Sequence, residues 1–303
     1  MSKVIYDALS LTSKIHGTGD LIEMLGLEDV VWETVKGAHG YKQRLYWNCI
    51  SIHFDGTDDM GVWLELTGQG CRAFETYGNG NYEGLFQEIL LNPGEMKLTR
   101  LDVAFDDDEG ILDINQLCDD TRCGEFVCRF TDFQVIYGSK GNSINHGSMK
   151  SEIFIRIYDK AMERGFADGR HWIRVELQLR RDRALAFIKH PGSIGDKFAG
   201  VLSNYLKYVD PDGMDSNRWR WPTKYYWEQL LNCAQRIRLY EKPGTEYNMS
   251  NLDTLVFSQM GGAIHTALTI YGEDLFKEKL RNERPSQLNA KYKKLIHDFG
   301  QKK

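Results

Sequence analysis

Apolar and polar residues alternate most regularly in two segments of the chain. Residues 98–106 read LTRLDVAFD, and residues 172–180 read WIRVELQLR. Successive side chains of a strand point to opposite faces of its sheet. Both segments therefore predict strands with apolar residues on one face and acidic side chains, Asp102 and Glu176, on the other.

Two interpretations of this pattern stay open. If the two strands are neighbours in one sheet, Asp102 and Glu176 present carboxylate oxygens on a single surface, and these are ligands that Mg²⁺ or Mn²⁺ prefers. Alternatively, the polar residues form the solvated outer face of a half-covered antiparallel sheet.

The first half of the chain predicts further strands, separated by turns rich in Gly, Asn and Asp. These strands span residues 8–13, 40–46, 49–55 and 62–67, and helical patterns span residues 19–27, 82–91 and 114–123. Residues 130–137 and 152–158 predict a hairpin. After residue 180 the pattern becomes mostly helical, over residues 183–188, 196–209, 222–232 and 252–279.

These elements predict an α+β fold with a largely antiparallel sheet, helices packed on it, and a smaller C-terminal helical domain. A change in composition near residues 210–217 places the boundary between domains 1–212 and 213–303. No apolar run approaches the roughly 18 residues that cross a bilayer, and the N-terminus lacks a signal-peptide profile. We therefore expect a cytoplasmic protein without a membrane partner.

Positive charge is clustered although the net charge is −5. Basic groups can form a local phosphate-binding groove, although each run alone is more often a solvated surface. A stretch in which Arg218 and Arg220 alternate with Trp219 and Trp221 suits either single-stranded DNA or the packing of a helical domain. The basic residues gather in three places: Arg170, Arg174, Arg180, Arg181 and Arg183; Arg218 and Arg220; and the lysine-rich tail from Lys277.

Several familiar motifs are missing from the sequence. The chain has no GxxxxGK[ST] loop, no GxSxG elbow and no HExxH, which argues against a P-loop ATPase, an α/β-hydrolase and a zinc protease. The six cysteines lack a standard zinc spacing.

Six segments together resemble the Rep_trans family of replication initiation factors, and the resemblance spans about residues 7–240. This family includes rolling-circle initiators of Gram-positive plasmids, phage initiators and relaxases of conjugative elements, and the sequence is most similar to the last two groups. The segments are DALSLT at 7–12, GVWLELTGQGCR at 61–72, residues 98–107, IRIYDK at 155–160, residues 172–181 and residues 221–227.

The resemblance implies an origin-specific DNA relaxase or rolling-circle replication initiator. Such proteins nick one strand by tyrosine attack, with a divalent metal, and stay attached to the 5′ phosphate. A host helicase is the implied partner because this chain carries no motor, and the active form is a monomer or a dimer. Two alternatives are a catalytically silent origin-binding protein that recruits the helicase, and a metal-dependent nuclease that uses water.

By the same resemblance, Asp102 and Glu176 hold Mg²⁺ or Mn²⁺, and Gln178 is a third ligand or orients one. Lys160 is expected to stabilise the transition state. Arg156 is expected to contact phosphate, and for both Arg156 and Lys160 the alternative is a cross-strand salt bridge to the acids.

The nucleophile is the remaining assignment. Plasmid members of the family are expected to carry it about ten residues after the glutamate strand, where this chain has Phe187 and no tyrosine. Tyr205 is the first candidate, on the next helix, with its hydroxyl expected to face Asp102 and Glu176. Tyr158 is the second candidate because it shares a strand face with Arg156 and Lys160, and Tyr208 is the third.

Overall fold

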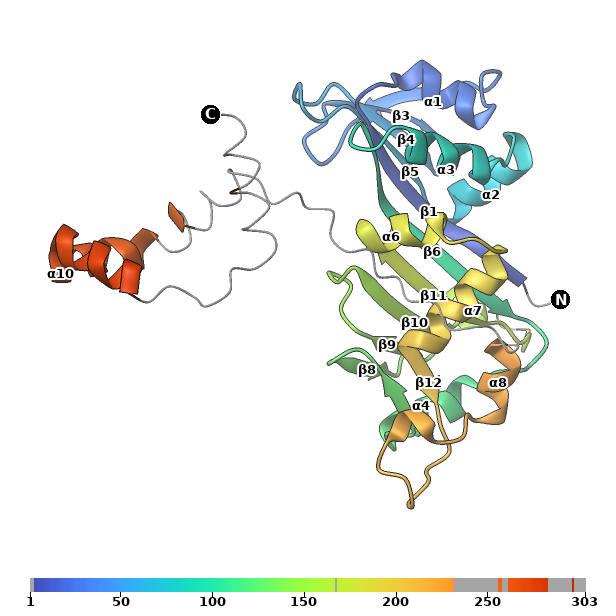
Figure 1. The fold of residues 1–303 in the computed structure, drawn as a ribbon. Helices are drawn as coiled ribbons and strands as arrows, with labels where there is room; N and C mark the ends of the chain where they lie inside the picture. Colours follow the sequence, from blue (N-terminus) through green and yellow to red (C-terminus); the bar gives the residue numbers. More distant parts are fainter. Residues whose placement is uncertain (1–2, 167, 232–255, 258–260, 283–295, 297–303) are drawn as a thin grey trace. The chain divides into compact units, whose positions relative to one another are not determined.

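Ten antiparallel strands form one sheet in the order β2-β3-β4-β5-β1-β6-β11-β10-β9-β8 in the computed structural model of the chain (Figure 1). The structure describes residues 3–166, 168–231, 256–257, 261–282 and 296. Four neighbouring interior strands are β1 (Lys3–Ser13), β6 (Met96–Asp107), β11 (Ile173–Arg180) and β10 (Ile153–Asp159). The flanking strands are β2 (Glu33–Lys36), β3 (Gln43–Trp47), β4 (Ile50–Phe54), β5 (Val62–Leu66), β9 (Ser143–His146) and β8 (Phe133–Ile136).

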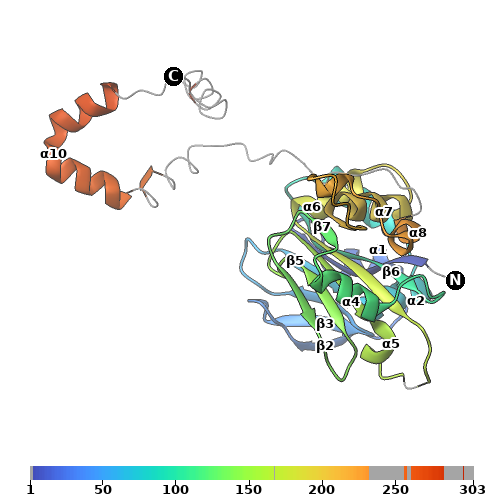
Figure 2. The ribbon, with the colours of Figure 1, turned by 90° about the horizontal axis from the view of Figure 1, so that it is seen from below.

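Figure 2 shows α6 (Asp182–Lys189), α7 (Ile194–Tyr205) and α8 (Tyr225–Leu231) together on one side of this sheet, whereas the short α5 (Lys160–Glu163) lies on the opposite side. A short second sheet pairs β7 (Phe126–Cys128) with β12 (Leu206–Tyr208). The α+β class predicted from the sequence is confirmed. The helices are α1 (Thr18–Leu25), α2 (Gly68–Tyr77), α3 (Tyr82–Leu91), α4 (Ile114–Arg122), α5 (Lys160–Glu163), α6 (Asp182–Lys189), α7 (Ile194–Tyr205), α8 (Tyr225–Leu231) and α10 (Gly261–Asn282), with a 3₁₀ turn at η1 (Arg218–Arg220).

The hydrophobic core lies between the helices and the apolar face of the sheet. Leu101, Val103 and Leu177 are fully buried there, and burial of each such side chain contributes about 1.5–3 kcal/mol to stability. Phe198 of α7 stacks on Phe105 of β6, with ring centroids 6.4 Å apart. The helix α7 therefore covers the face of β6 that carries Phe105, and Asp102 lies on the opposite face.

A β-bulge interrupts the pairing of β1 with β6. Tyr6 lies opposite Val103 and Ala8 lies opposite Asp102, so Asp7 is the extra residue. Tyr6 remains on the core side, where its ring contacts the ring of Tyr82 at 4.5 Å. The bulge directs Asp7 to the face that carries Asp102.

Two predicted elements are wrong in detail. The expected hairpin between residues 130–137 and 152–158 does not form, because β9 lies between β8 and β10 and pairs with both. The helix predicted over residues 196–209 ends at Tyr205, and the following three residues form β12 against β7.

The chain separates into two compact units, residues 1–241 and 242–303. The first unit extends beyond the boundary at 212/213 that the composition suggests. The physical reason is α8, whose Trp227 is fully buried and lies 4.8 Å from the ring of Tyr208. In the second unit the described helix is α10, which bends at Gly272. Within the described residues, no helix has the length and apolar character to cross a membrane.

Candidate active site on the sheet

The two acidic residues singled out by the sequence lie on neighbouring strands and on one face. On β6, Asp102 is directly opposite Gln178 of β11. Glu176 is two residues from Gln178 on β11 and lies opposite Arg156 of β10 on its other side. The shared strand phase therefore brings Asp102, Glu176, Gln178 and Arg156 together on the face opposite the core.

Asp102 is buried and bound by Arg100, its neighbour on the same face of β6. Nε of Arg100 donates to both carboxylate oxygens of Asp102, at 2.9 Å and 3.1 Å, and Nη2 adds a further contact. Burial raises the pKa of Asp102 to about 7, against the opposing effect of Arg100, and the nearby charges of Glu176 and Asp7 raise it further. Burial also raises the pKa of Glu176, and Asp7 is its next cause. Three carboxylates thus share one region of low dielectric.

Tyr158 of β10 points into this acidic group. Its hydroxyl donates to Oε2 of Glu176 at 3.1 Å and accepts from Nζ of Lys160 at 3.2 Å. The guanidinium of Arg156 lies 4.1 Å from the centre of its ring. Burial, and next the charge of Glu176, raise the pKa of Tyr158 far above the ordinary phenol value. The hydroxyl therefore stays protonated until a reaction removes its proton.

Lys160 lies at the first position of α5 and not on the strand itself, because β10 ends at Asp159. Asp159 caps this short helix by accepting from the backbone N–H of Met162 at 2.9 Å. The side chain of Lys160 is buried, and its Nζ lies 2.8 Å from Oε2 of Glu163. The strand-to-helix junction thus directs a buried ammonium group toward the phenol of Tyr158.

Sequence reasoning missed the part that Asp7 plays in this site. Its Oδ2 lies 2.6 Å from Nη1 of Arg174, and its charge reaches both Asp102 and Glu176. The segment DALSLT was singled out only as a shared motif. Asp7 is the first residue of that motif, and this was the only hint of its role in the sequence. The hydrophobic pattern does not reveal the bulge that directs Asp7 to the face of Asp102.

Arg174 is not available to DNA, contrary to the role predicted from the arginine cluster. It is buried between Asp7 and Asp106, donating to Asp106 at 2.6 Å and 2.8 Å. Trp172 donates to the same Asp106 through Nε1 at 2.8 Å. Arg174 therefore acts as the internal counter-ion that holds two acidic side chains in place.

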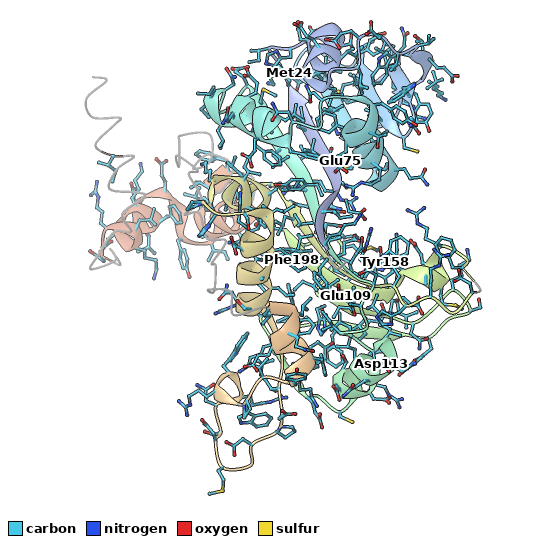
Figure 3. All side chains as sticks on the ribbon, turned by 90° about the vertical axis from the view of Figure 1, so that its right-hand side faces the viewer. Met24, Glu75, Glu109, Asp113, Tyr158 and Phe198 are labelled. Carbon is cyan, nitrogen blue, oxygen red and sulfur yellow. The ribbon has the colours of Figure 1, made fainter. Side chains whose placement is uncertain are left out.

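Tyr205 is not brought to the acidic group, so the expected orientation of its hydroxyl is wrong. It ends α7, and its ring stacks on Phe130 with centroids 6.1 Å apart. Figure 3 shows Phe198 of α7 and Tyr158 on opposite sides of the central strands. Tyr208 is equally remote, because its hydroxyl is buried 2.7 Å from Thr121.

Phe187 stands where plasmid members of the family are expected to carry the nucleophile. Its side chain is fully buried in the core beneath α6, on the side of the sheet opposite Asp102. Among the three tyrosines proposed from the sequence, Tyr158 is the one whose hydroxyl contacts Glu176.

The other predicted DNA-binding arginines have different surroundings. On α6, Arg181 is exposed at the N-cap and Arg183 pairs with Glu152 at 3.5 Å. Arg218 donates to the backbone oxygen of Phe126 at 3.0 Å, and Arg220 pairs with Asp215 at 2.7 Å. These contacts tie η1 to the rest of the unit and support the packing interpretation of this stretch. The lysine-rich tail beyond residue 282 lies, except for residue 296, outside the described residues.

The residues on the polar face suit a magnesium-type ion completed by substrate. In the part of the chain that the structure describes, no three His, Cys, Asp or Glu side chains are grouped so as to hold a metal by themselves. Mg²⁺ is usually bound by one or two carboxylates together with water and substrate phosphates. Asp102 and Glu176 supply such carboxylates, and a bound cation would relieve the repulsion between these two groups and Asp7.

Gln178 adds a polar group to the same place. Its side chain is buried, and its Nε2 has no hydrogen-bond partner among the described residues. Its Oε1 accepts only a long contact of 3.5 Å from Arg180. A buried amide in this state is available to a ligand, because burying an amide without a partner is costly.

Comparisons with known proteins identify the family of the chain. Residues 3–87 match the model of the rolling circle replication initiation protein N-terminal domain, and residues 96–278 match Rep_trans, the replication initiation factor. The chain is 28% identical over 263 residues to the putative DNA relaxase NicK of Bacillus subtilis (strain 168), covering 80% of this chain and 74% of that one. It is similar to the solved rolling circle replication initiator protein from Geobacillus stearothermophilus, with a TM-score of 0.70 and 32% identity over 79% of this chain and 99% of that one. The chain belongs to the replication initiation factor family of rolling-circle initiators and relaxases.

Proposed function

We propose that this protein nicks one strand of DNA at an origin, with Tyr158 as the nucleophile. The observation that carries the proposal is the buried hydroxyl of Tyr158, held between the carboxylate of Glu176 and the ammonium of Lys160. This is the arrangement that an activated nucleophile requires, with a base on one side and a cation on the other.

In the proposed reaction the phenolic oxygen of Tyr158 attacks the scissile phosphorus. The proton of the hydroxyl leaves through its hydrogen bond to Oε2 of Glu176 and passes on to water, so that the carboxylate is ionised when it holds a cation. A tyrosyl–phosphorus bond forms, and the bond from phosphorus to the 3′ oxygen breaks. The 3′ oxygen takes a proton from water and leaves as a hydroxyl, while the 5′ phosphate remains on Tyr158.

Lys160 and Arg156 balance the charge during this step. The ammonium of Lys160 is already in contact with the phenolic oxygen, so it stabilises negative charge as the proton leaves. The guanidinium of Arg156 lies over the same ring and is positioned for a phosphate oxygen. Because the phosphodiester to tyrosine conserves the energy of the broken bond, attack by a 3′ hydroxyl can reseal the strand.

A divalent cation completes the proposed site. Asp102, Glu176 and the side-chain oxygen of Gln178 would hold Mg²⁺ or Mn²⁺. When bound, the ion would polarise the scissile phosphate and stabilise the departing oxygen. Host helicase is the proposed partner that unwinds the nicked duplex.

The experiment is incubation of the purified protein with a supercoiled plasmid that carries the origin, in the presence of Mn²⁺. The expected product is a nicked circle with protein covalently attached to its 5′ end. Nicked circles without attached protein would instead indicate a nuclease that uses water. Binding without nicking would indicate a silent origin-binding protein.

A further inference from the structure

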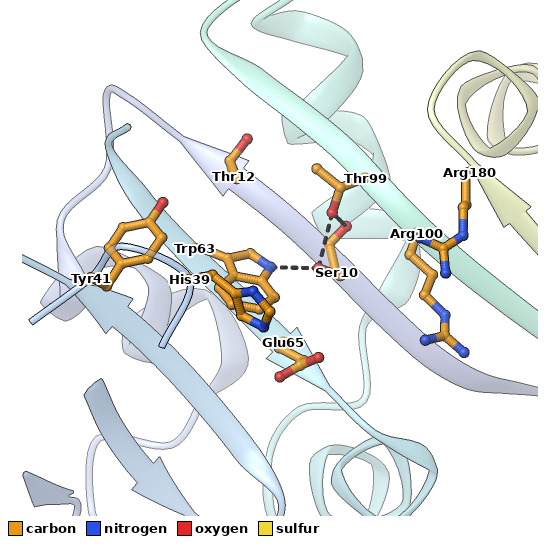
Figure 4. A pocket seen from close by; sticks show the side chains of 9 residues that line it. All are labelled: Ser10, Thr12, His39, Tyr41, Trp63, Glu65, Thr99, Arg100 and Arg180. Carbon is orange, nitrogen blue, oxygen red and sulfur yellow. Dashed lines mark hydrogen bonds between the residues drawn. The ribbon is translucent and has the colours of Figure 1, made fainter. Parts of the chain in front are cut away.

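A pocket opens beside Arg100 (Figure 4), on the face of the sheet that also carries Asp102 and Glu176. Its volume is about 460 Å³, within the range of small-molecule binding pockets. Nothing in the proposed strand-cleavage reaction uses it. Nine residues from β1, β5, β6, β11 and the segment before β3 line it: Ser10, Thr12, His39, Tyr41, Trp63, Glu65, Thr99, Arg100 and Arg180.

One side of the pocket is aromatic and fixed in position. The ring of Trp63 stacks on His53, with centroids 4.3 Å apart and planes 20° apart. Nε1 of Trp63 donates to Oγ of Ser10 at 2.5 Å, and Oγ of Ser10 is also within 2.9 Å of Oγ1 of Thr99. His39 and Tyr41 flank the indole at 5.2 Å and 6.2 Å.

The imidazole of His53, which stacks on Trp63, carries no charge at neutral pH. Burial, followed by the charges of Arg44 and His39, lowers the pKa of His53 to about 4. His53 is buried, and neither of its ring nitrogens has a partner among the described residues. It therefore serves as a flat packing surface that holds the indole of Trp63 toward the pocket.

The other side of the pocket is cationic and leads to the acidic group. Arg180 lies directly opposite Arg100 in the pairing of β11 with β6, and its Nε is buried without a partner among the described residues. Arg100 is the residue that binds Asp102. Trp63 lies opposite Thr12 and Asp102 lies opposite Ala8, which places the two about 16 Å apart for ordinary strand geometry.

We propose that this pocket binds one unstacked base of the single-stranded DNA, a few nucleotides from the scissile phosphate. Base stacking on aromatic side chains next to cations that contact phosphates is the general mode of single-strand binding. The hydroxyls of Ser10, Thr12 and Thr99 and the carboxylate of Glu65 supply groups for the edge of the base. The inference rests on the proposed function, because a strand attached at Tyr158 supplies the base.

The test compares two single-stranded probes of equal length and charge: oligothymidylate, and the sugar–phosphate oligomer that lacks all bases. Phosphate contacts are common to both probes, so a difference in affinity reports the bases alone. We expect the wild-type protein to bind oligothymidylate about 5- to 150-fold more tightly, the range for one stacked base. Equal affinity for the two probes would overturn the proposal.

Substitutions then show which residues cause the tighter binding of oligothymidylate. In Trp63→Leu most of the preference for oligothymidylate should disappear, while affinity for the baseless oligomer changes little. Trp63→Phe, which keeps a flat ring, should retain much of the preference. Trp47→Leu is the matched control. Trp47 pairs with the buried Ile50, so its side chain lies on the core face of the sheet, opposite the pocket. Loss of affinity for both probes in Trp63→Leu, or an equal loss of preference in Trp47→Leu, would contradict the proposal.

Two further measurements separate the possible failures. Because Trp63 packs on His53, thermal unfolding of each variant is recorded, and Tyr41→Leu is a second test if Trp63→Leu does not fold. The wild-type protein is also assayed for a covalent adduct on the origin plasmid. An adduct without base preference contradicts the pocket alone, whereas base preference without an adduct contradicts the nicking function and leaves the pocket as a DNA-binding site.

Discussion

Nζ of Lys160 lies 3.2 Å from the hydroxyl oxygen of Tyr158, and both side chains are buried. A buried ammonium group in contact with a phenol favours the phenolate and opposes the effect of burial. The proposed nucleophile and the group proposed to stabilise its charge are therefore in contact before DNA binds. This contact is the basis of the first two predictions.

Tyr158→Phe is expected to eliminate the covalent protein–DNA adduct, because it removes the attacking oxygen. Tyr205→Phe is the matched control and should form the adduct at the wild-type rate, since Tyr205 lies against Phe130 on the other side of the sheet. The measurement is gel analysis of protein-linked plasmid DNA. An adduct that persists in Tyr158→Phe and disappears in Tyr205→Phe would return the role to Tyr205.

Lys160→Met should lower the rate of adduct formation by about 10²–10³-fold, the loss seen when one donor to a developing oxyanion is removed. Lys160→Arg keeps the positive charge and should recover part of the rate. Glu163→Gln removes the other partner of Lys160 without touching Tyr158, so it should have the smaller effect. Single-turnover rates at saturating protein provide the comparison, and equal rates for Lys160→Met and Lys160→Arg would argue against a role for the charge.

The pH dependence of nicking is expected to follow Asp102. Its pKa is raised to about 7, and only the ionised carboxylate can hold a cation. At limiting Mn²⁺, the logarithm of the rate should rise with pH below about 7 and then level off. Rates measured across this range test the prediction, and a rate that falls with rising pH would contradict it.

The raised pKa of Asp102 makes folding stability fall with rising pH, whereas the nicking rate is expected to increase. Because burial makes the folded state bind this proton more tightly than the unfolded state does, the contribution of Asp102 to stability is present at low pH. It is lost as pH rises from the ordinary carboxyl range to about 7. Denaturant unfolding of Asp102→Asn should therefore lack this loss, while the variant forms no adduct and still binds DNA.

Arg174→Ala should destabilise the protein by about 3–5 kcal/mol, because it leaves Asp7 and Asp106 buried without their counter-ion. Arg170→Ala is a suitable control, since Arg170 is an exposed residue paired with exposed Asp168, and a change there should be within about 1 kcal/mol. Urea unfolding measures both free energies. Comparable values for the two variants would mean that Arg174 is not the internal counter-ion described above.

DNA affinity should depend steeply on salt despite the net charge of −5. The logarithm of the affinity is expected to fall linearly with the logarithm of the salt concentration. Exposed Arg181 should contribute one phosphate contact, so that Arg181→Ala reduces the slope by about 1. A flat response in the wild-type protein would mean that the basic residues do not form a nucleic-acid surface.

The strand pattern predicted which face of the sheet carries Asp102 and Glu176. Alternation in residues 98–106 and 172–180 fixed the shared face of Asp102 and Glu176, because strand phase is a local property of the sequence. It could not place Tyr205, since a helical pattern does not say which face of the sheet a helix covers. The phase of residues 155–160 predicted that Tyr158 and Arg156 share one face, and in the structure the guanidinium of Arg156 lies 4.1 Å from the ring centre of Tyr158.

The helix α2 was absent from the sequence prediction because Gly68 and Gly70 lower helix propensity. The structure supplies the reason for both glycines. A Cβ at Gly70 would lie 2.3 Å from the carbonyl oxygen of Cys49, and one at Gly68 would lie 2.9 Å from Oδ1 of Asp7. These contacts join segments that are distant in sequence, so no local pattern reveals them.

Tyr158 lies on an interior strand, paired with Ser143 of β9 on one side and Arg174 of β11 on the other. Its main chain is therefore anchored by ladder hydrogen bonds from both neighbours. In the proposed covalent complex, tension from unwinding the duplex would pass into β10, which has seven strands of the sheet on one side and two on the other. The hydrogen bonds of several strands would share this force, so the protein would resist tension in the attached DNA.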